Sequence, residues 1–213
     1  MDMLPVSIYG WPMASVSQSL ITYKPIIIKN MGQYYHAVVL PPQSKKLTIA
    51  GAFIPGDYKM WCKLMEHSWA ENDFVRTVER HFSPGERFYK HRLVWAGDYA
   101  DHEPGHDTDL YDLCENKSIK SKIDPVGDEF KYLVNHTRKV YVDKTAMPKD
   151  SDGWQVHSLP LLTCEGNGRG GGDYFHDDPE VMLHVGSWAR DIISVETEFP
   201  ADYTELQVKF EPR

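Results

Sequence analysis

The apolar residues of this chain repeat with two different periods, and the order of those periods is its strongest constraint on the fold. Alternating β-forming residues predict strands at residues 34–40 and 47–53, which suggest a hairpin. Residues 59–82 instead place apolar side chains on one helical face. The period of two then returns, and it predicts extended segments at residues 88–95, 132–134, 140–142, 154–162, 188–199 and 206–210. Because strands and helices do not alternate along the chain, we expect an α+β fold with a mostly antiparallel sheet and a short two-helix insertion.

The helical insertion carries its own start and stop signals. Asn72 is a good N-cap residue for its second helix, and Pro84 with Gly85 ends the helical pattern. In the extended segment 154–162, Pro160 indicates a sheet edge or a bulge, because proline cannot donate a ladder hydrogen bond.

Length and composition predict one globular domain. The chain has 213 residues, of which 41% are hydrophobic and 25% charged, so it can bury one sizeable core. Residues 1–30 differ from the rest, with three prolines and scattered serines, and we expect a flexible or loosely docked leader before a domain at 31–213. The chain shows no secretory signal, and its three cysteines are too sparse for a disulfide framework. These features favour a cytoplasmic protein.

The net charge of −8 excludes some classes of partner. Broad nucleic-acid binding is not expected, because that affinity comes largely from Lys and Arg. Anionic membrane surfaces would repel the chain, and no stretch is apolar enough to span a bilayer.

The most unusual segment is rich in glycine and follows Glu165. Its glycines allow several backbone N–H groups to turn toward one anion, with Arg169 as a bidentate clamp. No Gly-Lys-Ser/Thr run follows, and no amphipathic helix opens, so neither a Walker loop nor a Rossmann fingerprint is present. The alternative is a flexible connection between strands. The predicted ligand-binding residues are Gly168, Arg169, Gly170, Gly171, Gly172 and Tyr174.

A second segment gathers acidic residues and histidines between Asp98 and Asp109. His102 to His106 match the zinc-protease pattern H-E-x-x-H by letter, but Pro104 and Gly105 oppose the helix which that mechanism requires. A looser divalent-metal site is possible, with Asp101, His102, His106 and Asp107 as candidate ligands. The alternative is a solvated acidic loop.

The candidate catalytic residues are His67, Asp98 and Asp173. His67 lies in the helical insertion, where the alternative is a partly buried structural histidine. Asp98 and Asp173 both belong to Gly-Asp-Tyr triplets, in which Gly-Asp is also a natural turn pair. Tyr99, Tyr174 or Trp188 could stack on a ligand ring.

Several motifs together resemble a family of hypothetical proteins from bacteria and their phages or mobile elements. They are MGQYY (31–35), LMEHSW (64–69), VWAGDYAD (94–101), VNHT (134–137), LPLL (159–162), EGNGRGGGDY (165–174) and VGSWARD (185–191). The resemblance covers residues 31–210 and implies a bacterial or phage origin. It implies no catalytic roles.

Three functions therefore compete. The leading hypothesis is binding, with or without turnover, of a small anionic or nucleotide-like ligand by the glycine-rich segment and Arg169. The second is a divalent-metal-dependent hydrolase that uses the segment 98–109. The third is a non-enzymatic protein that binds a host protein.

Overall fold

The computed structural model describes residues 33–44, 46–121, 123–166 and 174–212. Contacts within the chain group Gly32–Arg213 as one compact unit, and this unit is described here. The predicted leader at residues 1–30 lies outside the described residues. The described chain is α+β, as the sequence predicts, and no helix in it is long and apolar enough to cross a membrane.

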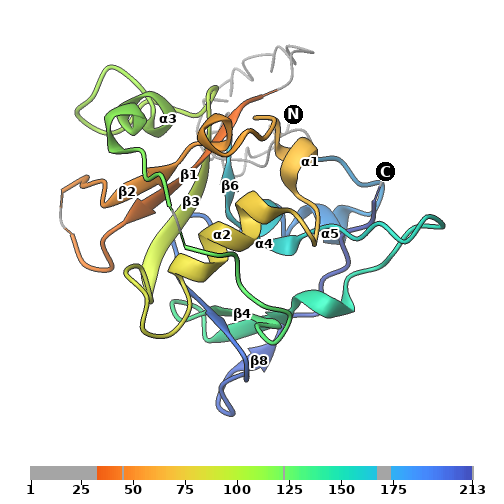
Figure 1. The fold of residues 1–213 in the computed structure, drawn as a ribbon. Helices are drawn as coiled ribbons and strands as arrows, with labels where there is room; N and C mark the ends of the chain where they lie inside the picture. The colour runs from red at the N-terminus through yellow and green to blue at the C-terminus, as the bar shows by residue number, and fades with distance from the viewer. Residues whose placement is uncertain (1–32, 45, 122, 167–173, 213) are drawn as a thin grey trace, which may run out of the picture. The chain divides into compact units, whose positions relative to one another are not determined.

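Eight strands of the described chain form one sheet that is mostly antiparallel (Figure 1). They are β1 (Tyr35–Leu40), β2 (Gly51–Phe53), β3 (His91–Gly97), β4 (Tyr132–Asn135), β5 (Val140–Asp143), β6 (Cys164–Glu165), β7 (Ile192–Glu196) and β8 (Thr204–Glu205). The strand order is β2-β1-β3-β7-β4-β5-β8, and β6 pairs with β3 beside this path. Only the β3–β6 and β5–β8 pairs are parallel. The predicted hairpins β1–β2 and β4–β5 are both confirmed.

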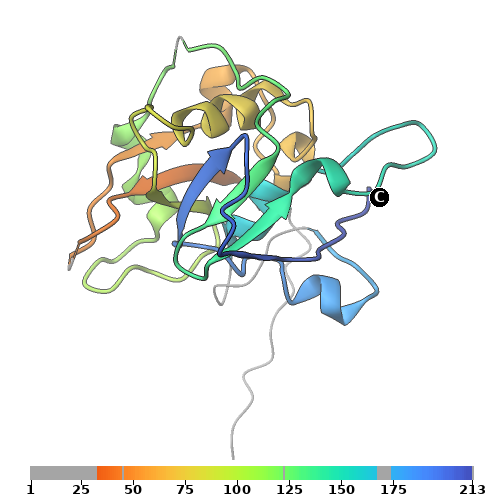
Figure 2. The same ribbon diagram turned by 90° about the horizontal axis from the view of Figure 1, so that it is seen from below.

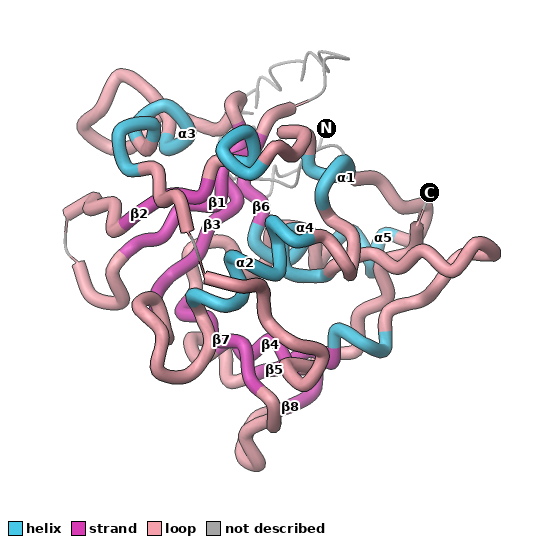
Figure 3. Tube along the Cα trace, viewed as in Figure 1, coloured by secondary structure: helices cyan, strands magenta, loops and turns pink. Residues whose placement is uncertain are grey.

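Five short α-helices accompany the sheet in the described residues. They are α1 (Leu64–His67), α2 (Asp73–His81), α3 (Leu110–Leu113), α4 (Ser158–Thr163) and α5 (Pro179–Met182). The first two are the predicted insertion between β2 and β3. Asn72 caps α2 as expected, because its side-chain oxygen accepts hydrogen bonds from the N–H groups of Phe74 and Val75. Loops make up much of the remainder (Figure 3).

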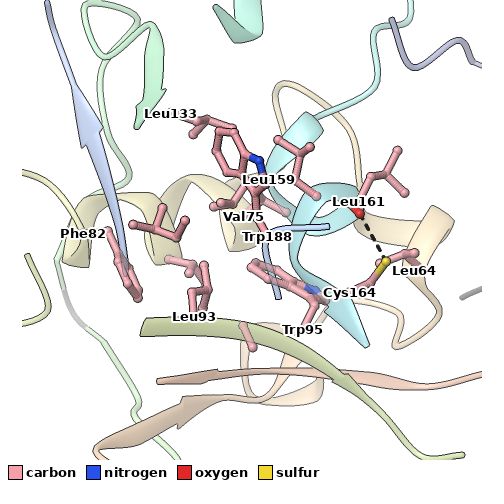
Figure 4. Close-up of a cluster of buried hydrophobic side chains, with 14 of the residues drawn as sticks. Leu64, Val75, Phe82, Leu93, Trp95, Leu133, Leu159, Leu161, Cys164 and Trp188 are labelled. Atoms are coloured by element: carbon pink, nitrogen blue, oxygen red, sulfur yellow. Dashed lines mark hydrogen bonds between the residues drawn. The ribbon is translucent and has the colours of Figure 1, made fainter. Parts of the chain in front are cut away.

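The main core lies between the sheet and the helices α2 and α4 (Figure 2). Leu93 and Trp95 point into it from β3, because side chains two residues apart share one face of a strand. Trp188 packs there with less than 2% of its surface exposed (Figure 4). The partners from α2 and α4 include Val75 and Leu159. Burial of this apolar surface is the main contribution that favours folding.

A smaller cluster covers the opposite face of the sheet. Val38 on β1 and Val94 on β3 pack there against Leu110 and Cys114 at α3. His36 joins them, with its ring stacked on Tyr111 at a centroid distance of 3.8 Å. Residues adjacent in sequence on β1 and β3 therefore enter different cores, which explains why both strands are buried almost throughout.

The expectation of an extended segment at residues 154–162 is wrong over its second half. Residues Ser158–Thr163 form α4, with His157 as its N-cap. Pro160 occupies the first turn of this helix, where backbone N–H groups have no partner within the helix, so the missing donor costs little. The entire helix is buried, and its apolar residues therefore lack the one-sided pattern of a surface helix.

Other predicted strands are shifted or shortened. β3 begins at His91 rather than at residue 88, and β7 begins at Ile192 rather than at residue 188. Residues 206–210 form no strand, although Val208 and Phe210 are buried and alternate with exposed residues. Alternation thus predicted the buried side of this segment but not its backbone pairing.

Candidate functional site

Most of the predicted glycine-rich site lies outside the described residues. This applies to Gly168, Arg169, Gly170, Gly171, Gly172 and Asp173, whose roles stay predictions. Tyr174 is described and is 3% exposed. Its hydroxyl accepts a hydrogen bond from the N–H of Glu211 at 3.1 Å, and its ring contacts Phe210 edge-on. The ring of Tyr174 is therefore packed into the fold rather than presented to solvent, and Trp188 is buried as well.

His67 is a fully buried residue whose two ring nitrogens both have partners. The indole N–H of Trp95 donates to Nε2 at 2.8 Å, so Nδ1 carries the proton and donates to the carbonyl of Trp61 at 3.0 Å. Burial lowers the pKa of His67 to about 4. A neutral imidazole with both nitrogens engaged fastens α1 to β3 and has no nitrogen left for a substrate.

Asp98 joins the end of β3 to the start of β1. Its carboxylate accepts from the N–H of Tyr34 at 3.1 Å, and its own N–H donates to the carbonyl of Tyr34 at 3.0 Å. Partial burial raises the pKa of Asp98, and the nearby carboxylates of Asp109 and Asp112 raise it further. The bonds to Tyr34 give Asp98 a structural function, and Tyr99 beside it is half-buried.

The predicted metal ligands do not gather. Residues 101–109 form no helix, as the proline and glycine in the H-E-x-x-H match predict. Asp101, His102, His106 and Asp107 are all exposed. Within the described ranges, no three His, Cys, Asp or Glu side chains lie close enough together to hold a metal ion. The metal-dependent hydrolase therefore draws no support from the described residues.

The fold instead brings three distant segments together on one guanidinium group. Arg190, which precedes β7, binds Glu165 through Nε at 2.7 Å and through Nη2 at 2.6 Å. It also binds Glu103 through Nη1 at 3.1 Å and through Nη2. Both carboxylates are 3% exposed. Glu103 comes from the acidic segment, Glu165 directly precedes the glycine-rich segment, and Arg190 belongs to VGSWARD.

Arg190 is held tightly in side chain and backbone. Burial alone would lower its pKa, but the hydrogen bonds to Glu165 and Glu103 outweigh that effect and raise it. Its φ angle of 68° lies in the left-handed region, which costs a residue with a Cβ about 1 kcal/mol. Its N–H donates to the carbonyl of Leu93 at 2.7 Å. The surrounding bonds thus hold an unfavourable backbone conformation that aims the guanidinium at both carboxylates.

A hollow of about 560 Å³ opens beside this cluster, and we call it the cation-lined pocket. It lies between the β1–β2 loop, the start of β3 and the segment 103–106. Three of its four charged lining residues are cations, although the whole chain is acidic. Its lining comprises Leu40, Pro41, Ser44, Lys46, Leu47, Thr48, Arg92, Glu103, Pro104, His106 and Arg190.

Arg92 is the lining cation with the greatest capacity to bind a ligand. It stands on β3 on the same face as Val94, and its Nε donates to the carbonyl of Arg190 at 3.2 Å. Among the described residues, its two terminal nitrogens have no hydrogen-bond partner and no ion pair. Sequence reasoning missed Arg92, because a single arginine at the start of a strand carries no motif.

A second buried ion cluster is structural. The ammonium of Lys144 donates to both carboxylate oxygens of Glu79 at 2.7 Å. His157 accepts from the N–H of Leu159 through Nδ1 at 3.2 Å, so its Nε2 carries a proton and faces Glu79 at 3.3 Å. That contact is too poorly aligned to count as a hydrogen bond. The carboxylate and the ammonium balance each other, and the cluster joins α2 to α4 within the core.

Comparison of the chain with protein-family models, with curated proteins and with solved structures returns no match. The resemblance to bacterial and phage proteins therefore stays a prediction. A functional conclusion has to rest on the geometry of the chain's own residues.

Proposed function

We propose that the protein binds a small anionic ligand, with a carboxylate or phosphate group, in the cation-lined pocket. The observation that supports this most is Arg92, whose terminal nitrogens are unengaged among the described residues while its Nε is fixed on a backbone carbonyl. A guanidinium group anchored in this way presents two parallel N–H donors, which is the geometry that carboxylate and phosphate oxygens accept.

The other charged residues of the pocket have different roles in ligand binding. Arg190 donates most of its N–H groups to Glu103 and Glu165. It therefore contributes more to the structure of the pocket wall than to ligand binding. Lys46 adds a mobile positive charge from the β1–β2 loop. The carboxylate of Glu103 at the wall disfavours a second anionic group on that side. A ligand whose negative charge is concentrated at one end fits this arrangement.

The size and the apolar lining of the pocket bear on the rest of the ligand. A volume of about 560 Å³ exceeds the needs of an inorganic ion and lies within the range of small-molecule sites. Leu40, Leu47 and Pro104 offer apolar contact away from the cations. A ring or short carbon skeleton attached to the anionic group would bury surface there. A nucleotide-sized ligand is compatible with this volume, although the sequence predicts such a ligand for the glycine-rich segment instead.

The test is a thermal-shift screen of the full chain against inorganic phosphate, mono- and dicarboxylates, and nucleotides. A ligand at about 100 times its dissociation constant should add about 2.7 kcal/mol to the free energy of unfolding. Arg92→Ala should weaken the hit about 10- to 100-fold, because charge-assisted hydrogen bonds contribute about 1.5 to 3 kcal/mol.

Arg87→Ala is the matched control, since Arg87 is exposed outside the pocket and rests on the ring of Phe88. This variant should bind the same ligand as the wild-type chain does. A screen with no hit, or a hit that Arg92→Ala leaves unchanged, would refute the proposal.

A further inference from the structure

A second and larger hollow has the opposite character, and we call it the tryptophan groove. It has a volume of about 960 Å³ and is lined by residues from 60–73 and 149–155. Trp69 and Trp154 meet in it edge-to-face, with ring centroids 5.4 Å apart and planes at 67°. The side chain of Trp154 is 58% exposed. Two adjoining aromatic rings that line a hollow offer a ligand more contact area than a single exposed ring does.

The local sequence fixes the position of Trp154. Residues 150–154 form a tight turn, in which the carboxylate of Asp150 accepts from the N–H groups of Asp152 at 2.9 Å and of Trp154 at 2.8 Å. Gly153 has a φ of 87°, a conformation that favours glycine. The next residues bridge to the segment after α1, since Val156 pairs with Trp69. Two chain segments thus hold the indole rings as adjoining walls before any ligand arrives.

The charges around the groove are almost all negative. Of the residues that the structure describes, five carboxylates line it, and Lys149 is its single cation. Glu66 and Asp150 accept backbone hydrogen bonds. In the described part of the chain, the carboxylates of Glu71, Asp73 and Asp152 have no hydrogen bond or ion pair of their own. These side chains are exposed at the rim and free to pair with an incoming cation.

We propose that the tryptophan groove binds a basic segment of a partner polypeptide. A lysine or arginine side chain would lie against the faces of Trp69 and Trp154, where the negative ring faces attract a cation. Its basic neighbours would pair with the carboxylates at the rim. The carboxylates are spread over two chain segments, 66–73 and 150–152, so they fit several positive charges along one chain better than one small cation. The groove shares no lining residue with the cation-lined pocket.

The experiment measures fluorescence anisotropy of a labelled ten-residue peptide of alternating lysine and glycine, titrated with the full chain. The same peptide with glutamine in place of lysine is the uncharged probe. We expect the lysine peptide to bind and the glutamine peptide to bind at least tenfold more weakly. Trp154→Ala should weaken lysine-peptide binding at least tenfold. Trp61→Ala is the matched control, because Trp61 is 73% exposed and lies outside the groove.

A chain of net charge −8 attracts any polycation. A control must therefore separate binding by the charges of the groove from attraction to the net charge of the whole chain. The double variant Glu71→Gln/Asp152→Asn removes two charges at the groove, and Glu198→Gln/Asp202→Asn removes two exposed charges elsewhere. The first should weaken binding by at least fivefold more than the second. Equal effects of the two double variants, or full binding by Trp154→Ala, would overturn the proposal. Equally tight binding of tetramethylammonium alone would also overturn it, in favour of a small-cation site.

Discussion

The cation-lined pocket and the tryptophan groove differ in how their charges are supported. In the pocket, the two carboxylates that bind Arg190 are buried, Arg190 is half-buried and donates most of its N–H groups to them, and Arg92 lies on a strand of the sheet. In the groove, the carboxylates are exposed and Trp154 stands on a surface turn. The wall of the pocket includes a buried ion cluster, whereas the groove is bordered by exposed carboxylates.

Because of this difference, substitutions in the two regions should affect different properties, namely stability in one and binding in the other. Buried charges can be removed only at a large cost, because the partner left behind loses both its ion pair and its access to water. Exposed charges and rings can be changed with little effect on folding. Substitution of Arg190 should therefore lower the free energy of unfolding strongly, whereas substitutions in the groove should mainly alter what the protein binds.

The largest effect is expected for Arg190→Ala. It leaves Glu103 and Glu165 without their shared guanidinium, so the free energy of unfolding should fall by about 3 to 5 kcal/mol. Arg190→Gly should be more stable than Arg190→Ala by about 1 kcal/mol, because the φ of 68° suits glycine. Urea denaturation of the three chains measures both differences. If Arg190→Ala lost less than 1 kcal/mol, the ion cluster of the pocket would contribute no more to stability than the exposed charges of the groove.

The next effect concerns His67, which packs against Phe74 and Trp95 in the main core. Unfolded histidine takes up a proton near its ordinary pKa of about 6.5, whereas buried His67 does so only at about 4. Below pH 6.5 the unfolded chain therefore binds more protons, and stability falls as the pH drops, until about pH 4. His67 alone should account for about 2 kcal/mol between pH 7 and pH 5.

His67→Gln is the matched variant for this effect, because glutamine offers one acceptor and one donor but does not titrate. Urea denaturation across this pH range should show a shallower slope for the variant. The double variant Glu71→Gln/Asp152→Asn should keep the wild-type slope, since the groove takes no part in it. A wild-type slope in His67→Gln would contradict the account of this histidine.

The smallest effect is expected for Trp154→Ala. More than half of this side chain is already exposed, so its removal should change the free energy of unfolding by less than about 0.5 kcal/mol. The same urea measurement provides the value. A loss above 2 kcal/mol would mean that the tryptophan pair stabilises the fold, and the contrast with the pocket would disappear.

The sequence predicted those parts of the fold that depend on local pattern. The helical insertion, the Asn72 cap and the hairpins β1–β2 and β4–β5 follow from periodicity and from capping chemistry. The helix α4 did not, because a wholly buried helix has no polar face to mark its period. By sequence Pro160 indicates a sheet edge or a bulge, whereas in the fold it lies in the first turn of a helix, which accepts a proline.

The site was harder to predict, because its residues are distant in the sequence. Glu103 and Glu165 lay within segments that were noticed for other reasons, and only the fold places both on Arg190. His67 stood out because two tryptophans lie near it in the sequence. Its two ring nitrogens, however, form hydrogen bonds with Trp61 and Trp95. Hydrogen-bond partners that are 28 residues apart leave no signal in a single sequence.

The proposed anion binding depends above all on Arg92. The most direct measurement follows the side-chain Nε–H signals of the arginines by NMR while inorganic phosphate is titrated into the ¹⁵N-labelled full chain. We expect a saturable shift of the Arg92 signal, assigned through its loss in Arg92→Ala, with a smaller shift of Arg190 and none of Arg87. An Arg92 signal that stays unchanged while phosphate shifts other arginines would contradict it.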